Sequence, residues 1–138
     1  MYEDNEMKLY IILNRNHEVS TLMNAASHLS AGITDCAKEM LFDAYQNASS
    51  GLQANMSHYP VVVLQAKNSS QLASAVQKAQ EAEITYNFFT NTMLSHSAEQ
   101  QIADTLNTEI DKLDFIAIAL FGNTEKLKPI TKKFSVYK

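Results

Sequence analysis

Residues 8–32, KLYIILNRNHEVSTLMNAASHLSAG, decide the fold, because this segment is typical of a strand that leads into a helix. Residues 9–13 form an apolar run without a polar face, as in a central strand that helices cover on both sides. Residues 14–17 then interrupt the run. We expect Ser20 to cap the helix that follows and Gly32 to end it in the left-handed conformation.

The helix in this segment has an apolar stripe of small and medium-sized side chains, namely Leu22, Ala25, Ala26 and Leu29. Such a stripe lets the helix lie close to a sheet. The polar residues 14–17 are then left at the carboxyl end of the strand, where open α/β sheets bind their ligands. This edge is therefore the first place to look for a functional site.

Length, charge and cysteine content indicate a single domain and restrict its partners and its location. A chain of 138 residues can bury one continuous core. The net charge of −4 makes nucleic-acid binding unlikely as a general property, because binding to phosphates depends on clustered Lys and Arg. Cys36 is alone, which fits a reducing compartment, and the acidic start resembles neither a signal peptide nor a membrane span. We expect a cytoplasmic protein without a membrane segment.

The rest of the chain alternates between strand and helix patterns. Residues 1–7 are predicted to be a polar lead-in, and residues 8–138 a single domain. Apolar runs predict strands at 61–64, 84–89, 115–121 and 134–137, while helical spacing predicts helices at 68–79, 92–111 and 124–130. Asn68 or Ser69, Ser95 or Ser97, and Asn123 or Thr124 are the expected caps. The alternation favours parallel strand pairing.

Residues 33–59 allow two interpretations. Ala37, Met40, Leu41, Ala44 and Tyr45 can line one face of a helix, but the turn-rich sequence NASSG follows at once. The alternative is a hairpin at the edge of the sheet, with residues 41–45 paired to residues 52–57. The sequence leaves this choice open.

Several segments together resemble a known family. They are NAASHLSAG at 24–32, YPVVVLQAKNSSQL at 59–72, LDFIAIALFGN at 113–123 and FSVY at 134–137. This pattern is similar to the family filed as domain of unknown function two-thousand, which is similar in fold to the type 2 peptidyl-tRNA hydrolases. The resemblance implies a single α/β domain with a roughly four-stranded mixed sheet, helices on both faces and a tendency to dimerise.

The departures from the hydrolases concern their functional residues. Those enzymes have a lysine early in the first helix, where this chain has Leu22 or Met23, and an aspartate after the third strand, where it has residues 90–93, TNTM. Apolar and amide side chains cannot supply the ammonium or carboxylate that the reaction needs. Pro129 in the last short helix is a further departure, and it suggests that this helix starts late or is irregular.

Two histidines are candidate catalytic residues. His17 follows the first strand and His96 lies in the loop after the third, so either could act as a general base. The alternative for each is an exposed histidine without a function. Candidate ligand-binding residues at the same crevice are Asn14, Ser20, Asn24, Thr90 and Thr92.

Other features favour structural roles. The four histidines and Cys36 form no metal motif, and glycine occurs only at 32, 51 and 122, so no phosphate loop can be written. We therefore expect no metal and no cofactor. The lysines near the carboxyl terminus are interpreted as a solvated surface, with phosphate contact as the alternative.

Two functions of different classes are consistent with these observations. The first is a non-catalytic binding or interaction module, a homodimer that has lost the hydrolytic residues of its superfamily. The second is a divergent hydrolase with its site at the carboxyl ends of the first and third strands, acting on an unknown small molecule. The expected dimer contact uses a region with few charges, represented by Leu41, Phe42, Tyr45, Leu52 and Met56.

Overall fold

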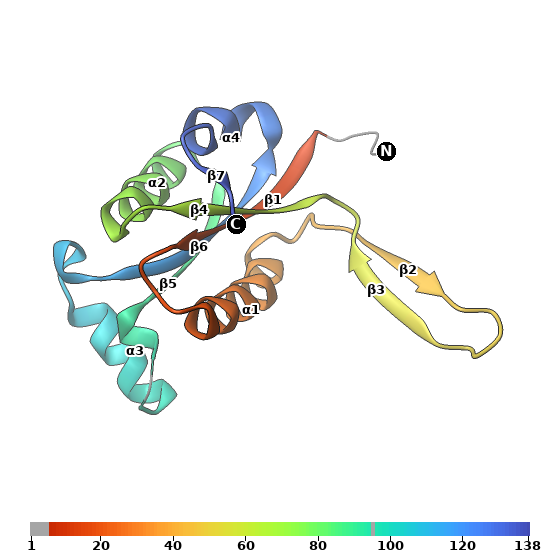
Figure 1. The fold of residues 1–138 in the computed structure, drawn as a ribbon, viewed down its shortest axis with the longest axis horizontal. Coiled ribbons are helices and arrows are strands. Elements are labelled where there is room, and N and C mark those ends of the chain that lie inside the picture. The colour runs from red at the N-terminus through yellow and green to blue at the C-terminus, as the bar shows by residue number, and fades with distance from the viewer. Residues whose placement is uncertain (1–5, 95) are drawn as a thin grey trace.

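The computed structural model describes residues 6–94 and 96–138. A five-stranded mixed sheet with the order β5-β6-β1-β4-β7 forms the body, and a separate two-stranded hairpin projects from it (Figure 1). The elements, in chain order, are β1 (Met7–Asn14), α1 (Val19–Cys36), β2 (Phe42–Gln46), β3 (Gln53–Ser57), β4 (Val61–Ala66), α2 (Ser69–Glu81), β5 (Thr85–Thr90), the 3-10 turn η1 (Asn91–Met93), α3 (Ala98–Asn107), the 3-10 turn η2 (Ile110–Lys112), β6 (Phe115–Asn123), α4 (Thr124–Thr131) and β7 (Ser135–Val136).

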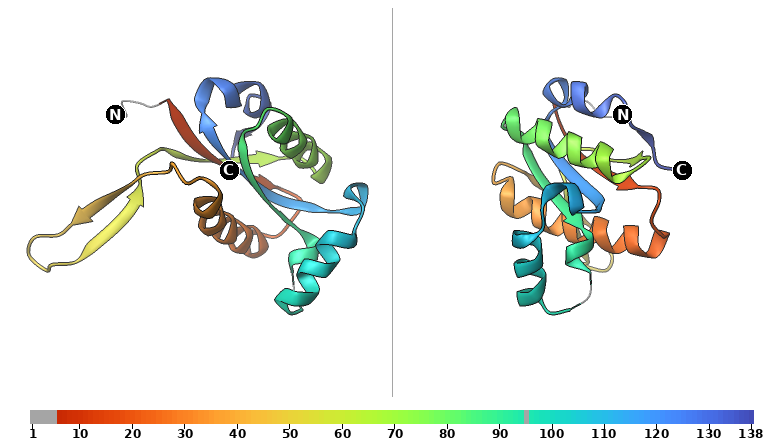
Figure 2. Two further views of the ribbon diagram at one scale, coloured as in Figure 1. Left: turned by 180° about the vertical axis from the view of Figure 1, so that it is seen from behind. Right: turned by 90° about the vertical axis from the view of Figure 1, so that its left-hand side faces the viewer.

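The sheet is covered on both faces, as the apolar runs predicted (Figure 2). On one face, α1 packs its stripe against alternate residues of β1 and β6. On the other face, α2 and α4 pack against the residues between them. The seven residues from Phe115 to Phe121 are all buried, because β6 lies inside the sheet and is covered by helices on both sides.

The pairing of the strands corrects two expectations. The body has five strands instead of roughly four, since the short β7 pairs with β4 at one edge. Only β1 and β4 are parallel neighbours, and every other pair in the sheet is antiparallel. The alternation of strand and helix predicted parallel pairing for β5 as well. That prediction was wrong because β6 runs antiparallel between β5 and β1.

Both ends of α1 also differ from the prediction. Glu18 precedes the helix, its side chain makes no capping bond, and Ser20 lies within the first turn instead of capping it. The helix continues past Gly32 to Cys36, so Gly32 does not end it. A Cβ atom at Gly32 would lie 2.6 Å from Asn87 Nδ2, and the glycine therefore serves the close approach of α1 to β5.

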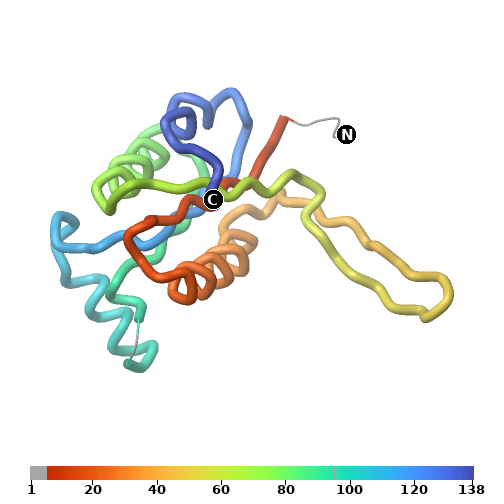
Figure 3. The backbone as a smooth tube through the Cα atoms, in the orientation of Figure 1, coloured from red at the N-terminus to blue at the C-terminus, as the bar shows by residue number. Residues whose placement is uncertain are grey.

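The hairpin interpretation of residues 33–59 is confirmed, and the helix interpretation is wrong. β2 and β3 pair in the antiparallel register Tyr45↔Ala54. They do not join the edge of the main sheet as expected; they form a sheet of their own, which extends away from the body (Figure 3). Nine of the ten strand residues are exposed, and Ser57 is the exception.

Helix α3 is shorter than expected, whereas α2 and α4 begin at their predicted caps. Only Ala98–Asn107 of the predicted helix 92–111 is α-helical, and Ile102 and Leu106 on its apolar stripe are 70% and 81% exposed. Ser97 caps α3, while the alternative cap, Ser95, lies outside the described residues. Asn68 caps α2 and Asn123 caps α4 as predicted. Pro129 lies inside α4, which begins at Thr124 and not late.

Residues 1–5 of the predicted lead-in lie outside the described residues. β1 already begins at Met7, which pairs with Asn123.

Candidate functional site

The carboxyl ends of β1 and β4 form the topological switch point of the sheet. These two strands are parallel neighbours, and the helices that follow them, α1 and α2, pack on opposite faces. Open α/β sheets bind their ligands where two such connections diverge. Asn16 Nδ2 donates to the Lys67 carbonyl at 2.8 Å, which ties the two connections together.

Asn14 connects this switch point to the start of β6. Its side chain is 1% exposed. Asn14 Nδ2 donates to the Phe115 carbonyl at 2.9 Å, and Asn14 Oδ1 accepts from the Asn16 N–H at 2.9 Å. Because a buried amide without partners would be costly, these bonds fix the β1–α1 connection against β6.

The His17 imidazole and the Asp114 carboxylate form a pair beside this switch point. His17 Nε2 lies 3.1 Å from Asp114 Oδ2, and the two side chains are 23% and 45% exposed. The His17 N–H also donates to the Asn14 carbonyl at 3.2 Å, so the turn that carries the imidazole is held at its base. The pair is thus anchored in the protein and open to solvent.

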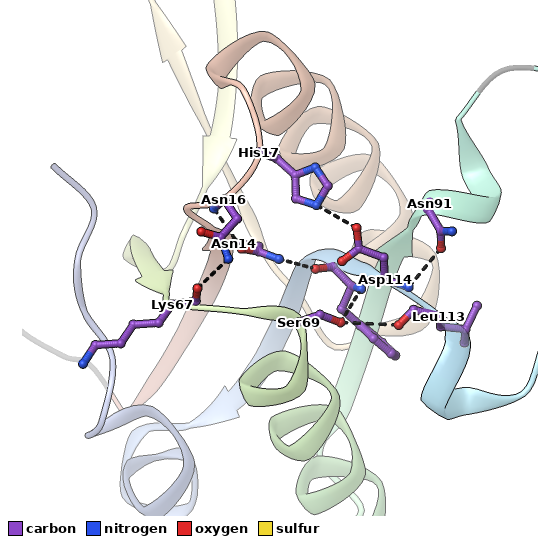
Figure 4. A network of polar contacts seen from close by, with 9 residues as sticks. Asn14, Asn16, His17, Lys67, Ser69, Asn91, Leu113 and Asp114 are labelled. Atoms are coloured by element: carbon purple, nitrogen blue, oxygen red, sulfur yellow. Dashed lines mark hydrogen bonds and ion pairs between the residues drawn. The ribbon is translucent and has the colours of Figure 1, made fainter.

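Two neighbouring residues hold the backbone around Asp114 (Figure 4). The Asp114 N–H donates to Asn91 Oδ1 at 3.0 Å, and the Asn91 N–H donates to the Asp114 carbonyl at 3.0 Å. Ser69 Oγ accepts from the Phe115 N–H at 2.8 Å. Asp114 also borders a hollow of about 420 Å³ between the start of α2 and η2. Its other lining residues are Ser69, Ser70, Ala73 and residues 110–113.

The threonines after β5 belong to a different cluster. Thr90 Oγ1, which is buried, lies 2.7 Å from Thr92 Oγ1, and Thr92 Oγ1 lies 2.7 Å from Thr105 Oγ1. Thr105 Oγ1 donates to the Gln101 carbonyl at 2.8 Å. This chain of hydroxyl groups joins the end of β5 to α3, so its role is to hold α3 against the sheet.

The predicted crevice between the first and third strands is therefore divided. β6 lies between β1 and β5, and its first residues fill the space where the two carboxyl ends were expected to meet. Asn14 and His17 lie on one side, with Asp114, while Thr90 and Thr92 lie on the other.

The remaining candidates are dispersed. Ser20 and Asn24 are exposed on α1. His96 has a φ of 66°, and its carbonyl accepts from Gln101 Nε2 at 3.4 Å. No hydrogen bond or ion pair joins His96 to His17 within residues 6–94 and 96–138. The structure thus brings His17 together with Asn14 and leaves His96 elsewhere.

Asp114 is the site residue that sequence reasoning missed. Its signal was its position directly before the most apolar strand, residues 115–121, but a carboxylate there is also typical of an ordinary strand boundary. Only the antiparallel pairing of β6 with β1 places Asp114 opposite the polar turn after Asn14.

The described part of the chain contains neither a metal-binding cluster nor a helix suited to a membrane. No group of three or more His, Cys, Asp or Glu side chains among these residues is arranged to hold a metal ion. Likewise, none of the helices in residues 6–94 and 96–138 has the length and apolar character needed to cross a membrane.

Comparison with known proteins identifies relatives without an assigned activity. A family model described as "Protein of unknown function (DUF2000)" matches residues 7–138. A solved structure of a protein of unknown function from Agrobacterium tumefaciens strain C58 is similar in fold, with a TM-score of 0.86 and 20% sequence identity. The similarity covers 98% of this chain and 100% of that chain. No curated protein matches the chain.

Proposed function

This chain belongs to the DUF2000 family of proteins of unknown function, and we propose that it is an interaction module that forms a homodimer through its hairpin. We also infer that its fold is a variant of the type 2 peptidyl-tRNA hydrolase fold. The observation that carries the proposed function is the hairpin, which projects from the body and carries most of its exposed apolar side chains on one face.

The register of the hairpin separates its two faces. Directly opposed residues share a face, and successive residues alternate between faces. Tyr45 is opposite Ala54, and Met56 lies on the same face opposite Asp43. The same alternation adds Leu41 and Leu52 at the two ends of this face. The other face carries the polar side chains Gln46, Gln53, Asn55 and Ser57, with Phe42 and Ala44.

The apolar face of the hairpin needs a partner. Tyr45, Leu52 and Met56 are 61%, 72% and 49% exposed. A hairpin of two strands is at best marginally stable in water, and large exposed apolar patches commonly mark interaction surfaces. Burial of this face against a partner would therefore stabilise the hairpin, whereas the buried elements of the body are already covered.

A second copy of the chain is the partner that the charges favour. Asp43 is the only charged residue in 41–57, and its Oδ2 lies 3.0 Å from His58 Nδ1. Each copy therefore brings only one carboxylate, held by His58, to a contact between two identical faces. Closed two-fold dimers are the commonest assemblies, and aromatic and Met side chains are enriched at such contacts.

Light scattering after size-exclusion chromatography tests this proposal at low micromolar concentration. The unaltered chain is expected to be a dimer, and the combined variant Tyr45→Asp with Met56→Asp a monomer, because two carboxylates would enter the apolar contact. Phe42 was expected in the contact, but it lies on the face opposite Tyr45 and Met56. Phe42→Asp is therefore the matched control, and the dimer should persist in it.

A monomeric unaltered chain would refute the dimer. A dimer that survives the combined variant would move the contact to another surface.

The second candidate function is that of a divergent hydrolase, and the contact of His17 with Asp114 is the observation that favours it. We do not propose peptidyl-tRNA as the substrate. The positions that resemble those of the hydrolases' lysine and aspartate hold uncharged residues, Leu22 or Met23 and 90–93.

A further inference from the structure

We propose that His17 and Asp114 form a hydrolytic dyad for small, uncharged acyl esters at the switch point of the sheet. His17 is the general base, and Asp114 is a positioning residue that orients the imidazole. This proposal rests on the hydrolase candidate described above and assigns its groups.

The geometry fixes which nitrogen is available for chemistry. His17 Nε2 lies 3.1 Å from Asp114 Oδ2, so Nε2 carries the proton that the carboxylate accepts. The lone pair of the neutral ring is then on Nδ1, which bonds to no group in the described part of the chain. The His17 side chain is 23% exposed, so the ring is accessible to water.

The surroundings hold the dyad in place before a substrate arrives. Asn14 anchors the turn of His17 to β6, and Asn91 bonds both backbone groups of Asp114. Both members are thus attached to the buried sheet through short connections. Preorganisation of this kind is what a catalytic pair requires, because loose side chains would lose the productive geometry.

The reaction follows from these positions. His17 Nδ1 takes a proton from a water molecule while the water oxygen attacks the ester carbonyl carbon. Asp114 stabilises the imidazolium that forms. The C–O bond to the leaving alcohol then breaks, and the imidazolium returns its proton to the leaving oxygen, which yields a carboxylic acid and an alcohol.

Charge restricts the substrate class. The Asp114 carboxylate lies beside His17, and Glu18 follows His17 in the sequence, so both disfavour a phosphate dianion. An uncharged acyl ester meets no such repulsion.

Hydrolysis of p-nitrophenyl acetate by the full chain tests the base. Every exposed imidazole hydrolyses this ester slowly, so His28→Gln is the matched control, since His28 is an exposed histidine on α1 outside the dyad and the hairpin. We expect His17→Gln to lower the rate about 100-fold and His28→Gln to change it less than twofold. The phosphate p-nitrophenyl phosphate is expected not to react.

Three results would count against the proposal in different ways. If the unaltered chain is no faster than the variant that lacks both histidines, the hydrolase candidate fails together with the dyad. If the chain is active but His17→Gln retains that activity, the hydrolase stands and the dyad is wrong. Hydrolysis of the phosphate ester would overturn the substrate class.

Nitrogen-15 NMR of the imidazole tests the positioning role of Asp114 without a substrate. In the unaltered chain, His17 is expected to carry its proton on Nε2 and its lone pair on Nδ1. Asp114→Asn is expected to alter this tautomer and lower the rate, and Asp114→Glu to restore both in part. An unchanged tautomer in Asp114→Asn would refute the positioning role.

Discussion

At the scale of single residues, Leu29 is the test of how α1 meets the sheet. Its side chain is 1% exposed in the core between α1 and the sheet. Leu29→Ala should lower the free energy of unfolding by about 2 to 5 kcal/mol, through lost burial and the cavity that remains. Urea denaturation measures this value.

Met23→Ala is the control for Leu29. It lies on the same helix but is 65% exposed, so its effect should stay within roughly 0.5 kcal/mol. An unchanged stability in Leu29→Ala would contradict the packing of α1.

The residue patterns of α1 predicted which side chains are buried, but they did not predict where the helix begins and ends. The stripe of α1 is buried as expected at Leu22, Ala25 and Leu29, because apolar periodicity reports directly on the side that faces the core. Ser20 and Gly32 failed as signals for the ends of the helix. Gly32 is needed for space beside Asn87, a contact between residues that are far apart in sequence and invisible to a local rule.

At the scale of elements, α4 contains an unusual residue whose removal should stabilise the protein. Pro129 is exposed inside the helix, where it cannot donate a backbone hydrogen bond. Pro129→Ala restores an N–H that can bond to the Glu125 carbonyl. The loss of proline's rigidity in the unfolded chain offsets part of this gain.

The expected result is a rise in the free energy of unfolding of about 1 to 2 kcal/mol, measured by thermal or urea denaturation. Pro129→Gly is a suitable comparison, because it restores the same N–H but adds backbone freedom, and it should stabilise less. A lower stability in Pro129→Ala would mean that α4 needs the proline.

The existence of most elements could be predicted, but their partners could not. α3 shows why: its spacing of Ile102 and Leu106 correctly indicated an amphipathic helix, and both side chains are nevertheless exposed. Periodicity identifies an apolar face without stating what covers it. Strand direction failed for β5 for the same reason, since pairing is decided by a strand that comes later in the chain.

At the scale of the whole molecule, the candidate site illustrates what topology adds. The rule that ligands bind at the carboxyl ends of strands predicted the position of Asn14 and His17. It could not predict that β6 would divide the crevice and bring in Asp114, because the order of strands is not written in any local pattern. Thr90 and Thr92 were consequently assigned to a site that they do not share.

The hairpin and the body should be separable, because the hairpin pairs only with itself and its side chains are exposed. The His58 N–H donates to the Leu41 carbonyl at 2.9 Å, so the two ends of the hairpin are already adjacent. Replacement of residues 42–57 by an Asn-Gly turn should therefore close the chain without strain. Met40 and Tyr59, which pack against the body, stay in place.

The shortened chain is expected to be a monomer with a cooperative unfolding transition. Its free energy of unfolding should agree within about 1 kcal/mol with that of the monomeric variant Tyr45→Asp with Met56→Asp. That variant is the proper reference, because dimerisation itself stabilises the unaltered chain and makes its stability depend on concentration. Calorimetry and light scattering measure the two quantities. A shortened chain that fails to fold would show that the hairpin is part of the folding unit, and one that remains a dimer would place the contact on the body.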